Sequence, residues 1–173
     1  MVEGYNKKMK NTKFNFQELV NNYSDMIYNI AIRYLGNKED AEDIVQETFM
    51  RYIKSIKEKG EFDTEDHIKY WLIRVSLNLC NNEINSAKHN RNIFLEESKI
   101  ISYKDTKIDY NDFVNKLSSK YRNVFELFYI EDMKISDISK ILSISESNVK
   151  TRLKRARDKI KKILQLGGEE DNE

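Results

Sequence analysis

The sequence ISDISKILSISESNVKTRLKRARDKIKK, residues 135–162, decides the fold of the second half of this chain. Apolar residues recur three and four positions apart on both sides of a short polar break at residues 143–145. Ser145 is expected to cap the helix that follows, because a serine hydroxyl accepts hydrogen bonds from the free N–H groups of a first turn. The pattern predicts two helices packed across a tight turn, a helix-turn-helix. Its apolar positions are Ile138, Leu142, Ile144, Val149, Leu153, Ala156 and Ile160.

The second helix of this pair has one apolar side and one basic side. Residues 147–164 contain eight basic side chains and one acidic side chain. Contact between so many cations and DNA phosphates releases counterions, so the pattern predicts a DNA-binding helix. A solvated amphipathic helix is the alternative that basic composition alone leaves open. At about 3.6 residues per turn, the side opposite the apolar stripe carries Ser147, Thr151, Lys154 and Arg155, with Lys150 on a flank.

The composition of the whole chain favours a helical protein with an uneven charge distribution. The 173 residues include no proline and five glycines, and 39% of them are hydrophobic, enough for one or two small cores. The net charge of +1 conceals an acidic segment, since residues 36–66 hold ten acidic and five basic side chains. This segment is expected to meet a partner other than nucleic acid.

Several classes of function lack support in the sequence. The single cysteine, Cys80, lies in an apolar helical pattern, which excludes a disulfide framework or a cysteine zinc site. His67 and His89 lack the spacing of metal ligands, and no glycine-rich phosphate loop occurs, so we expect no metal, no cofactor and no enzymatic activity. No apolar run is long enough to insert into a membrane, and residues 1–13 do not resemble a signal peptide. A cytoplasmic protein is expected.

Three more helices are expected in the first half of the chain. The first is predicted over residues 14–35, with Gly36 as its C-terminal stop and Asn37 as the N-cap of the next. The second, from residue 38 to about 56, carries its acidic residues in the first turns, where the helix dipole favours them. It is expected to bury Ala41, Ile44, Val45, Thr48, Tyr52 and Ile56 and to expose Asp43, Gln46, Glu47, Met50 and Lys54.

A loop over residues 57–66 is expected to lead into a third helix over residues 67–88. The apolar residues of this helix are Ile68, Trp71, Leu72, Val75 and Leu79, and we expect them to be buried. An arginine and several asparagines interleave with them, a combination suited to contacts with phosphates and exposed bases. The alternative is an ordinary core helix with a polar back. The polar residues are Lys69, Arg74, Asn78, Asn81, Asn82 and Asn85.

Helical periodicity weakens over residues 90–109, which predicts a flexible linker between two domains at residues 14–89 and 110–165. About twenty residues can extend to roughly 65 Å, nearly two DNA turns of about 34 Å each. Two domains so joined can contact separate sites on one duplex. The expected fold is therefore all-α, with two small helical domains and a helix-turn-helix in the C-terminal one.

Three sequence blocks follow one another along the chain: YLGNKEDAEDIVQETFMRYIK at residues 34–54, WLIRVSLNL at 71–79 and SNVKTRLKRAR at 147–157. In this order they resemble the extracytoplasmic function (ECF) sigma factors, the small specificity subunits of bacterial RNA polymerase. Three ordered blocks are far more specific than one motif. The resemblance implies binding to core RNA polymerase and promoter DNA, with an anti-sigma factor as a further partner.

The resemblance also implies roles for individual residues. The positions that match the polymerase-docking surface of the family are Asp43, Gln46, Glu47 and Met50. Near the family's pocket for a base flipped from the minus-ten element fall Phe62 and Asn78, with Arg74 and Asn82 on the same helix; Arg74 can equally stabilise packing. The positions that match those reading the minus-thirty-five element are Lys150, Thr151, Lys154 and Arg155. These last four agree with the face deduced from helical geometry.

The sequence departs from the family pattern at three places. Ser139 and Ser143 stand where the family usually has alanine and glycine, and residues 118–119 replace a segment that usually contains proline. Ser143 must tolerate a turn conformation that glycine adopts more easily, at a cost of about 1 kcal/mol.

A stand-alone helix-turn-helix regulator is the competing class of function. It would explain residues 135–162 and predicts tight duplex binding without polymerase. It leaves the acidic helix and the helix that carries Trp71 without a purpose.

Overall fold

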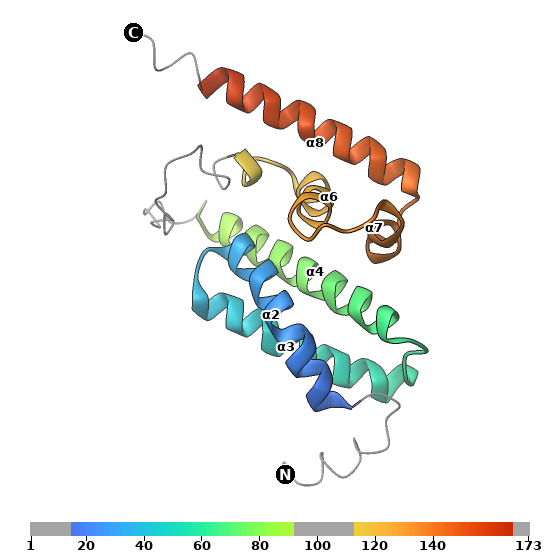
Figure 1. Cartoon of the computed structure of the whole chain (residues 1–173). Coiled ribbons are helices and arrows are strands. Elements are labelled where there is room, and N and C mark those ends of the chain that lie inside the picture. The colour runs from blue at the N-terminus through green and yellow to red at the C-terminus, as the bar shows by residue number, and fades with distance from the viewer. Residues whose placement is uncertain (1–14, 92–112, 168–173) are drawn as a thin grey trace. The chain divides into compact units, whose positions relative to one another are not determined.

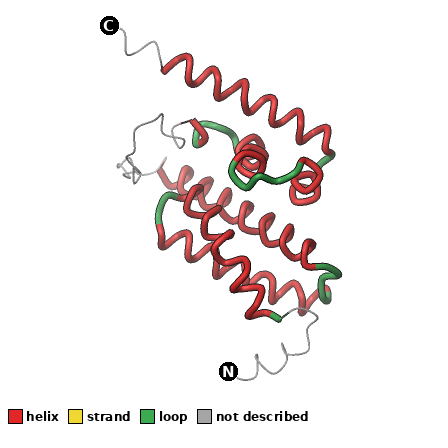
Figure 2. The backbone as a smooth tube through the Cα atoms, in the orientation of Figure 1, coloured by secondary structure: helices red, strands yellow, loops and turns green. Residues whose placement is uncertain are grey.

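The computed structural model describes residues 15–91 and 113–167, and every regular element among them is an α-helix (Figures 1 and 2). The chain divides into two compact units, one within residues 1–101 and one within residues 102–173. The prediction of an all-α protein with two helical domains is confirmed. Most of the predicted linker lies outside the described residues. The helices are α2 (Phe16–Leu35), α3 (Lys38–Lys59), α4 (Glu65–Arg91), α6 (Ser119–Tyr129), α7 (Ile135–Leu142) and α8 (Glu146–Gly167).

The turn between α2 and α3 is built by the predicted residues. Gly36 adopts a left-handed conformation with φ +79°, and its N–H donates to the Ile32 carbonyl at 2.9 Å. The side chain of Asn37 then accepts from the Asp40 N–H at 2.8 Å, which caps the start of α3. Both predictions at this turn are confirmed. A connection this short packs α2 directly against α3.

The core of the first unit lies between α2, α3 and α4. Phe49 is buried and packs edge-on against Phe16, with ring centroids 6.0 Å apart, although the sequence pattern did not predict its burial. Val45, Ile56, Trp71 and Val75, which we expected to be buried, are only half-buried. The buried apolar side chains are Leu19, Ile27, Ile30, Ala31 and Tyr34 of α2, Ala41, Ile44, Phe49 and Tyr52 of α3, and Ile68, Leu72, Ile73, Leu77, Leu79 and Cys80 of α4.

The loop between α3 and α4 is shorter than predicted. α3 continues to Lys59 and ends at Gly60, and α4 begins at Glu65, so the predicted loop over residues 57–66 shrinks to residues 60–64. Lysines stabilise the last turn of a helix and acids stabilise the first, so Lys57 and Lys59 belong to α3 and Glu65 and Asp66 belong to α4. The hydroxyl of Thr64 also accepts from the His67 N–H at 3.2 Å, as an N-cap does.

The second unit contains the predicted helix-turn-helix. Ser143 is left-handed, with φ 52° and ψ 47°, as the turn requires. Ser139 stabilises this turn, because its hydroxyl donates to the Ile144 carbonyl at 2.6 Å. The Ser145 hydroxyl accepts from the Asn148 N–H at 3.2 Å, so the predicted cap of α8 is confirmed. The buried apolar side chains around the turn are Val124 and Leu127 of α6, Ile138 and Ile141 of α7, and Val149, Leu153 and Ala156 of α8.

Candidate nucleic-acid and protein interfaces

The outward side of α3 presents an apolar side chain among acidic and amide groups. Met50 is 64% exposed, Asp43 and Gln46 are exposed, and Glu47 is half-exposed. These four residues, here named the α3 ridge, lie opposite the buried stripe that includes Ala41. The Arg51 Nε donates to the Glu47 Oε1 at 2.7 Å, so one acid of the ridge is paired within the helix. An exposed apolar group with a polar rim is suited to a protein partner.

Phe62, in the loop between α3 and α4, is held by other aromatic rings. It stacks on Tyr52 with centroids 5.5 Å apart and an interplanar angle of 18°. It also makes edge contacts with His67 at 5.0 Å and Trp71 at 5.7 Å. Phe62 is therefore half-buried and fixed in place at the start of α4. Such a ring can act as a preformed stacking surface.

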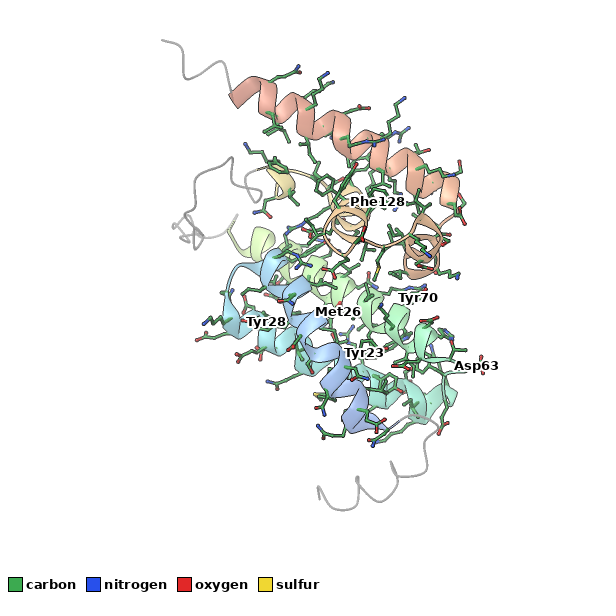
Figure 3. All side chains as sticks on the ribbon, viewed as in Figure 1. Tyr23, Met26, Tyr28, Asp63, Tyr70 and Phe128 are labelled. Atoms are coloured by element: carbon green, nitrogen blue, oxygen red, sulfur yellow. The ribbon has the colours of Figure 1, made fainter. Side chains whose placement is uncertain are left out.

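A hydrogen bond between distant residues ties α2 to the beginning of α4. The Tyr23 hydroxyl donates to the Glu65 Oε1 at 2.9 Å, close to the connection that carries Asp63 (Figure 3). Burial and the hydrogen bond to Glu65 raise the pKa of Tyr23 to about 12. Burial also raises the pKa of Tyr52, the ring beneath Phe62, to about 12. Sequence patterns did not indicate this support for the loop, because its members lie far apart in the chain.

The polar residues predicted on α4 share one strip of the helix. Arg74, Asn78 and Asn82 are spaced four residues apart, and residues at this spacing lie on the same face. Asn78 and Asn82 are exposed, whereas Arg74 is half-buried. Trp71 lies on the same side of α4 by this geometry, and its ring contacts Phe62. The fold thus places Phe62 at one end of the polar strip formed by Arg74, Asn78 and Asn82, named here the α4 strip.

The exposed side of α8 carries the four predicted DNA-contacting residues. Lys150, Thr151, Lys154 and Arg155 are all exposed. The Thr151 hydroxyl donates to the Ser147 carbonyl at 2.9 Å, so the backbone of the helix uses that donor. Arg155 differs from the two lysines because its guanidinium hydrogen-bonds the Tyr121 hydroxyl of α6, which lowers the pKa of Tyr121 below its ordinary value.

Family models account for both units of the chain. One described as Sigma-70 region 2 matches residues 19–90, and one described as Sigma-70, region 4 matches residues 109–160. The chain is also 31% identical over 169 residues to the ECF RNA polymerase sigma factor SigW of Bacillus subtilis (strain 168), covering 86% of this chain and 88% of that protein. This chain belongs to the ECF sigma factors.

Other comparisons agree. The sigma factor is 29% identical over 156 residues to the RNA polymerase sigma factor SigV of Bacillus subtilis (strain 168), covering 87% of this chain and 91% of that protein. Its fold is similar to that of the sigma factor RpoE solved in complex with the anti-sigma factor NepR from Bartonella quintana. That similarity has a TM-score of 0.64 at 22% identity and covers 87% of this chain and 96% of the other.

The family supplies the function. This sigma factor binds core RNA polymerase and directs promoter-specific initiation of transcription, as the sequence predicted. The match to region 2 includes both the acidic α3 and the Trp-bearing α4, which a stand-alone helix-turn-helix regulator leaves unexplained.

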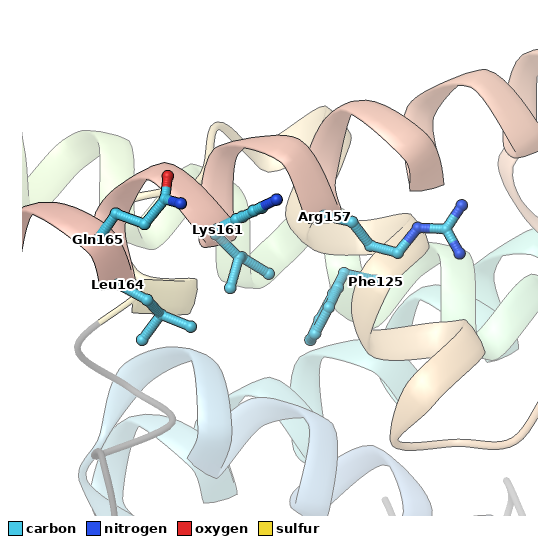
Figure 4. A pocket seen from close by; sticks show the side chains of 6 residues that line it. Phe125, Arg157, Lys161, Leu164 and Gln165 are labelled. Atoms are coloured by element: carbon cyan, nitrogen blue, oxygen red, sulfur yellow. The ribbon is translucent and has the colours of Figure 1, made fainter.

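A shallow pocket of about 390 Å³ lies between α6 and α8 of the sigma factor (Figure 4). Its lining side chains are Phe125, Arg157, Ile160, Lys161, Leu164 and Gln165. The lining is mostly apolar, with two cationic side chains among it. In helical position, Lys161 lies well away from Arg155 around α8, while Phe125 and Ile160 of the pocket lining pack against the buried cluster of Leu117, Tyr121 and Ala156.

Among the described residues, no three His, Cys, Asp or Glu side chains gather closely enough to hold a metal ion. Within residues 15–91 and 113–167, none of the helices combines the length and apolarity needed to cross a bilayer.

Proposed function

We propose that the two units of this sigma factor divide promoter recognition between them. The first unit, residues 14–89, docks on core polymerase and captures an unpaired base of the minus-ten element. The second unit, residues 110–165, reads the minus-thirty-five element, and residues 90–109 join them. The observation that carries this proposal is the presence, in one chain, of an exposed acidic and apolar ridge on α3 and an exposed basic face on α8.

The α3 ridge is the proposed polymerase contact. Its residues, Asp43, Gln46, Glu47 and Met50, combine negative charge, amide groups and one exposed thioether. Complementary charge steers association with a basic partner surface, and a central exposed apolar side chain can supply much of the binding energy. Because Glu47 pairs with Arg51 in the free protein, docking on a cationic surface would exchange this pair for one between the two proteins.

The α4 strip and Phe62 are the proposed site for the minus-ten strand. Stacking of a base on an aromatic ring contributes about 1–3 kcal/mol, comparable with the few kcal/mol that extruding a base costs. Asn78 and Asn82 offer exposed amides that can hydrogen-bond base edges, and Arg74 supplies positive charge. Promoter opening would then draw on binding energy, and the sigma factor would act as an initiation factor without chemistry of its own.

The exposed face of α8 is the proposed reader of the minus-thirty-five element. A helix fits the major groove, where lysine and arginine donate to guanine and a threonine methyl group can contact thymine. Lys150, Thr151, Lys154 and Arg155 are exposed, whereas Val149, Leu153 and Ala156 form the buried stripe of α8. Serine and threonine side chains are short, so near the start of the helix they allow the close approach that contact with base edges needs.

Two further assignments follow from the family. The sigma factor RpoE of the comparison was solved with the anti-sigma factor NepR, and CnrH, which has a similar fold at TM-score 0.65, was solved with the cytosolic domain of CnrY. An anti-sigma factor is the proposed third partner, beside polymerase and promoter DNA. The proposed location is the cytoplasm, where bacterial RNA polymerase works.

The test is the affinity of the purified chain for core RNA polymerase in the absence of DNA. Tight one-to-one binding is the expected result. Absence of binding, together with tight binding to duplex DNA, would overturn the proposed division of labour.

A further inference from the structure

A row of basic side chains runs along one flank of α8 towards its end. Lys154, Arg157 and Lys161 follow one another three or four residues apart, so they lie on the same side of the helix. All three are exposed. The last two also line the pocket beside α6, and Figure 4 shows them with Gln165 on successive turns of α8. We name Lys154, Arg157 and Lys161 the α8 row.

The charge of the α8 row is not balanced by carboxylates within the described part of the chain. Among residues 15–91 and 113–167, the ion pairs include none of its three side chains. Arg157 makes one long hydrogen bond, from its guanidinium to the Tyr129 hydroxyl at 3.5 Å, which leaves its charge uncompensated. Like charges four residues apart on a helix repel each other. A segment that carries carboxylates would therefore be stabilised beside this row.

The residues that directly follow α8 supply such carboxylates. α8 ends at Gly167, and the sequence continues as GEEDNE at residues 168–173, which lie outside the described residues. Four of these six residues are acidic. The last turn of α8 contains no basic residue, so the negative end of the helix dipole repels the acids that follow it. A return of the acids towards the basic turns of α8 relieves this repulsion.

The length of residues 168–173 allows that return. Gly167 and Gly168 are consecutive glycines, and glycine readily adopts the left-handed conformation that reverses a chain after a helix. At about 1.5 Å per residue, Lys161 lies about 9 Å before the end of α8 and Lys154 about 20 Å before it. Six extended residues span about 20 Å. The acidic segment can therefore reach every member of the α8 row.

We propose that residues 168–173 fold back along α8 and occupy the α8 row in competition with DNA. This inference rests on the proposed function of α8, because Lys154 belongs to the face that is proposed to read the minus-thirty-five element. The acidic segment is an internal competitor that lowers the affinity of α8 for duplexes of any sequence. It keeps the free chain from occupying non-specific DNA, which a basic helix otherwise binds through charge alone.

The first experiment is carbodiimide crosslinking of the dilute full chain, mapped by mass spectrometry. The reagent joins a lysine Nζ to a carboxylate only where the two groups touch. We expect a bond between Lys161 and an acid of residues 169–173, and we expect added duplex DNA to abolish it. Lys159 is the matched control, because it is exposed on the opposite flank of α8, with its Nζ 5.6 Å from the Tyr121 ring centroid. Equal coupling of both lysines to these acids, or of neither, would overturn the docking.

The second experiment measures the affinity of the full chain for a duplex at low salt. Replacement of the four acids by their amides, Glu169→Gln, Glu170→Gln, Asp171→Asn and Glu173→Gln, should raise this affinity severalfold. The gain should shrink markedly when Lys161→Gln is already present and persist in full with Lys159→Gln. It should also fall at high salt, which screens contacts between exposed charges.

The paired backgrounds separate docking from a general effect of net charge. Equal gains with Lys161→Gln and with Lys159→Gln would show that the acids act through net charge, and the proposed contact would be wrong. A Lys161 crosslink without any change in duplex affinity would rule out competition with DNA. If neither the unsubstituted chain nor the amide variant binds duplex, while the Lys161 crosslink still forms, the proposed function of α8 is at fault and the docking of the segment is not.

Discussion

At the scale of single residues, the helix-turn-helix carries an unfavourable backbone conformation and a side chain that compensates for it. Ser143 is left-handed, a conformation in which an L-residue with a Cβ is disfavoured by about 1–2 kcal/mol. The Ser139 hydroxyl satisfies the Ile144 carbonyl on the other side of the same turn. Two serines that depart from the family pattern thus act on one turn with opposite effects.

Substitution of these two serines should change stability in opposite directions. Ser143→Gly should raise the free energy of unfolding by up to about 1 kcal/mol, since glycine adopts the left-handed conformation freely but loses more entropy on folding. Ser139→Ala should lower it by about 1 kcal/mol, because the Ile144 carbonyl loses its donor. Urea unfolding of the full chain, followed by circular dichroism, measures both. A free energy of unfolding lower for Ser143→Gly than for the unsubstituted chain would contradict backbone strain at Ser143.

The raised pKa values of Tyr23 and Tyr52 predict how the stability of the chain changes at alkaline pH. The folded pKa values of Tyr23 and Tyr52 are about 12, above the ordinary value of 10, so folding favours their protonated forms. Their contribution is fully present below pH 10 and is lost as the pH rises from 10 towards 12. Tyr52→Phe should therefore lose less stability over this range than the unsubstituted chain, as measured by the urea midpoint at each pH.

Tyr121 is the matched control for that titration. The hydrogen bond from Arg155 lowers the pKa of Tyr121, so folding favours the ionised form of this residue. Tyr121 therefore contributes to the free energy of unfolding above pH 10, its ordinary pKa, which is the opposite of Tyr52. Tyr121→Phe should lose more stability than the unsubstituted chain as the pH rises through this range. Identical pH profiles for Tyr52→Phe and Tyr121→Phe would refute the assignment of the two shifts.

At the scale of elements, the helices separate two kinds of surface. α3 buries one stripe and exposes an acidic ridge with Met50, whereas α8 buries one stripe and exposes cations. Each helix is held by its apolar side, so its exposed side is available to a partner without any change of fold. Substitutions on the two exposed sides should therefore affect different activities.

Paired alanine variants test this separation. Asp43→Ala with Gln46→Ala should weaken binding to core polymerase about tenfold, the usual scale for central interface side chains, and leave upstream sequence preference intact. Lys154→Ala with Arg155→Ala should weaken promoter use and leave polymerase affinity unchanged. Polymerase binding and promoter-directed transcription are measured on both. Equal damage to both activities by both pairs would show that the surfaces are not separate.

The loop before α4 offers a test of strand capture. Phe62→Ala removes the ring that stacks on Tyr52, and with it the surface proposed for an unpaired base. Open-complex formation should fall by about 5- to 150-fold, the equivalent of the 1–3 kcal/mol of one base stack, while polymerase binding persists. Permanganate reactivity of unpaired thymines reports opening. Phe62→Tyr keeps the ring and is the control; if it opens promoters as poorly as Phe62→Ala, stacking is not the cause.

At the scale of the whole molecule, the two compact units have separate apolar cores. A fragment of residues 1–101 should therefore remain helical and unfold cooperatively, because the core between α2, α3 and α4 is contained in it. It should bind core polymerase with an affinity close to that of the full chain and lose preference for the upstream element. Circular dichroism and polymerase binding check both points, and an unfolded fragment would contradict the independence of the cores.

Features that depend on neighbouring residues were determined by the sequence alone. The stop at Gly36, the caps at Asn37 and Ser145 and the turn at Ser143 are local hydrogen-bonding and backbone preferences, and all are present in the structure. The outward faces of α3 and α8 follow from the helical period in the same way. The order of the three sequence blocks was enough to indicate the family.

Only the tertiary structure decided which side chains from distant segments meet. Phe49 is buried in place of Val45 because Phe16 packs against it. Phe62 stacks on Tyr52, Tyr23 reaches Glu65 across 42 positions, and Tyr121 draws cations from two helices. These contacts depend on how helices pack, and the period of a single helix carries no information about its partner. The candidate site residues could therefore be predicted from the sequence, whereas the groups that hold them in position could not.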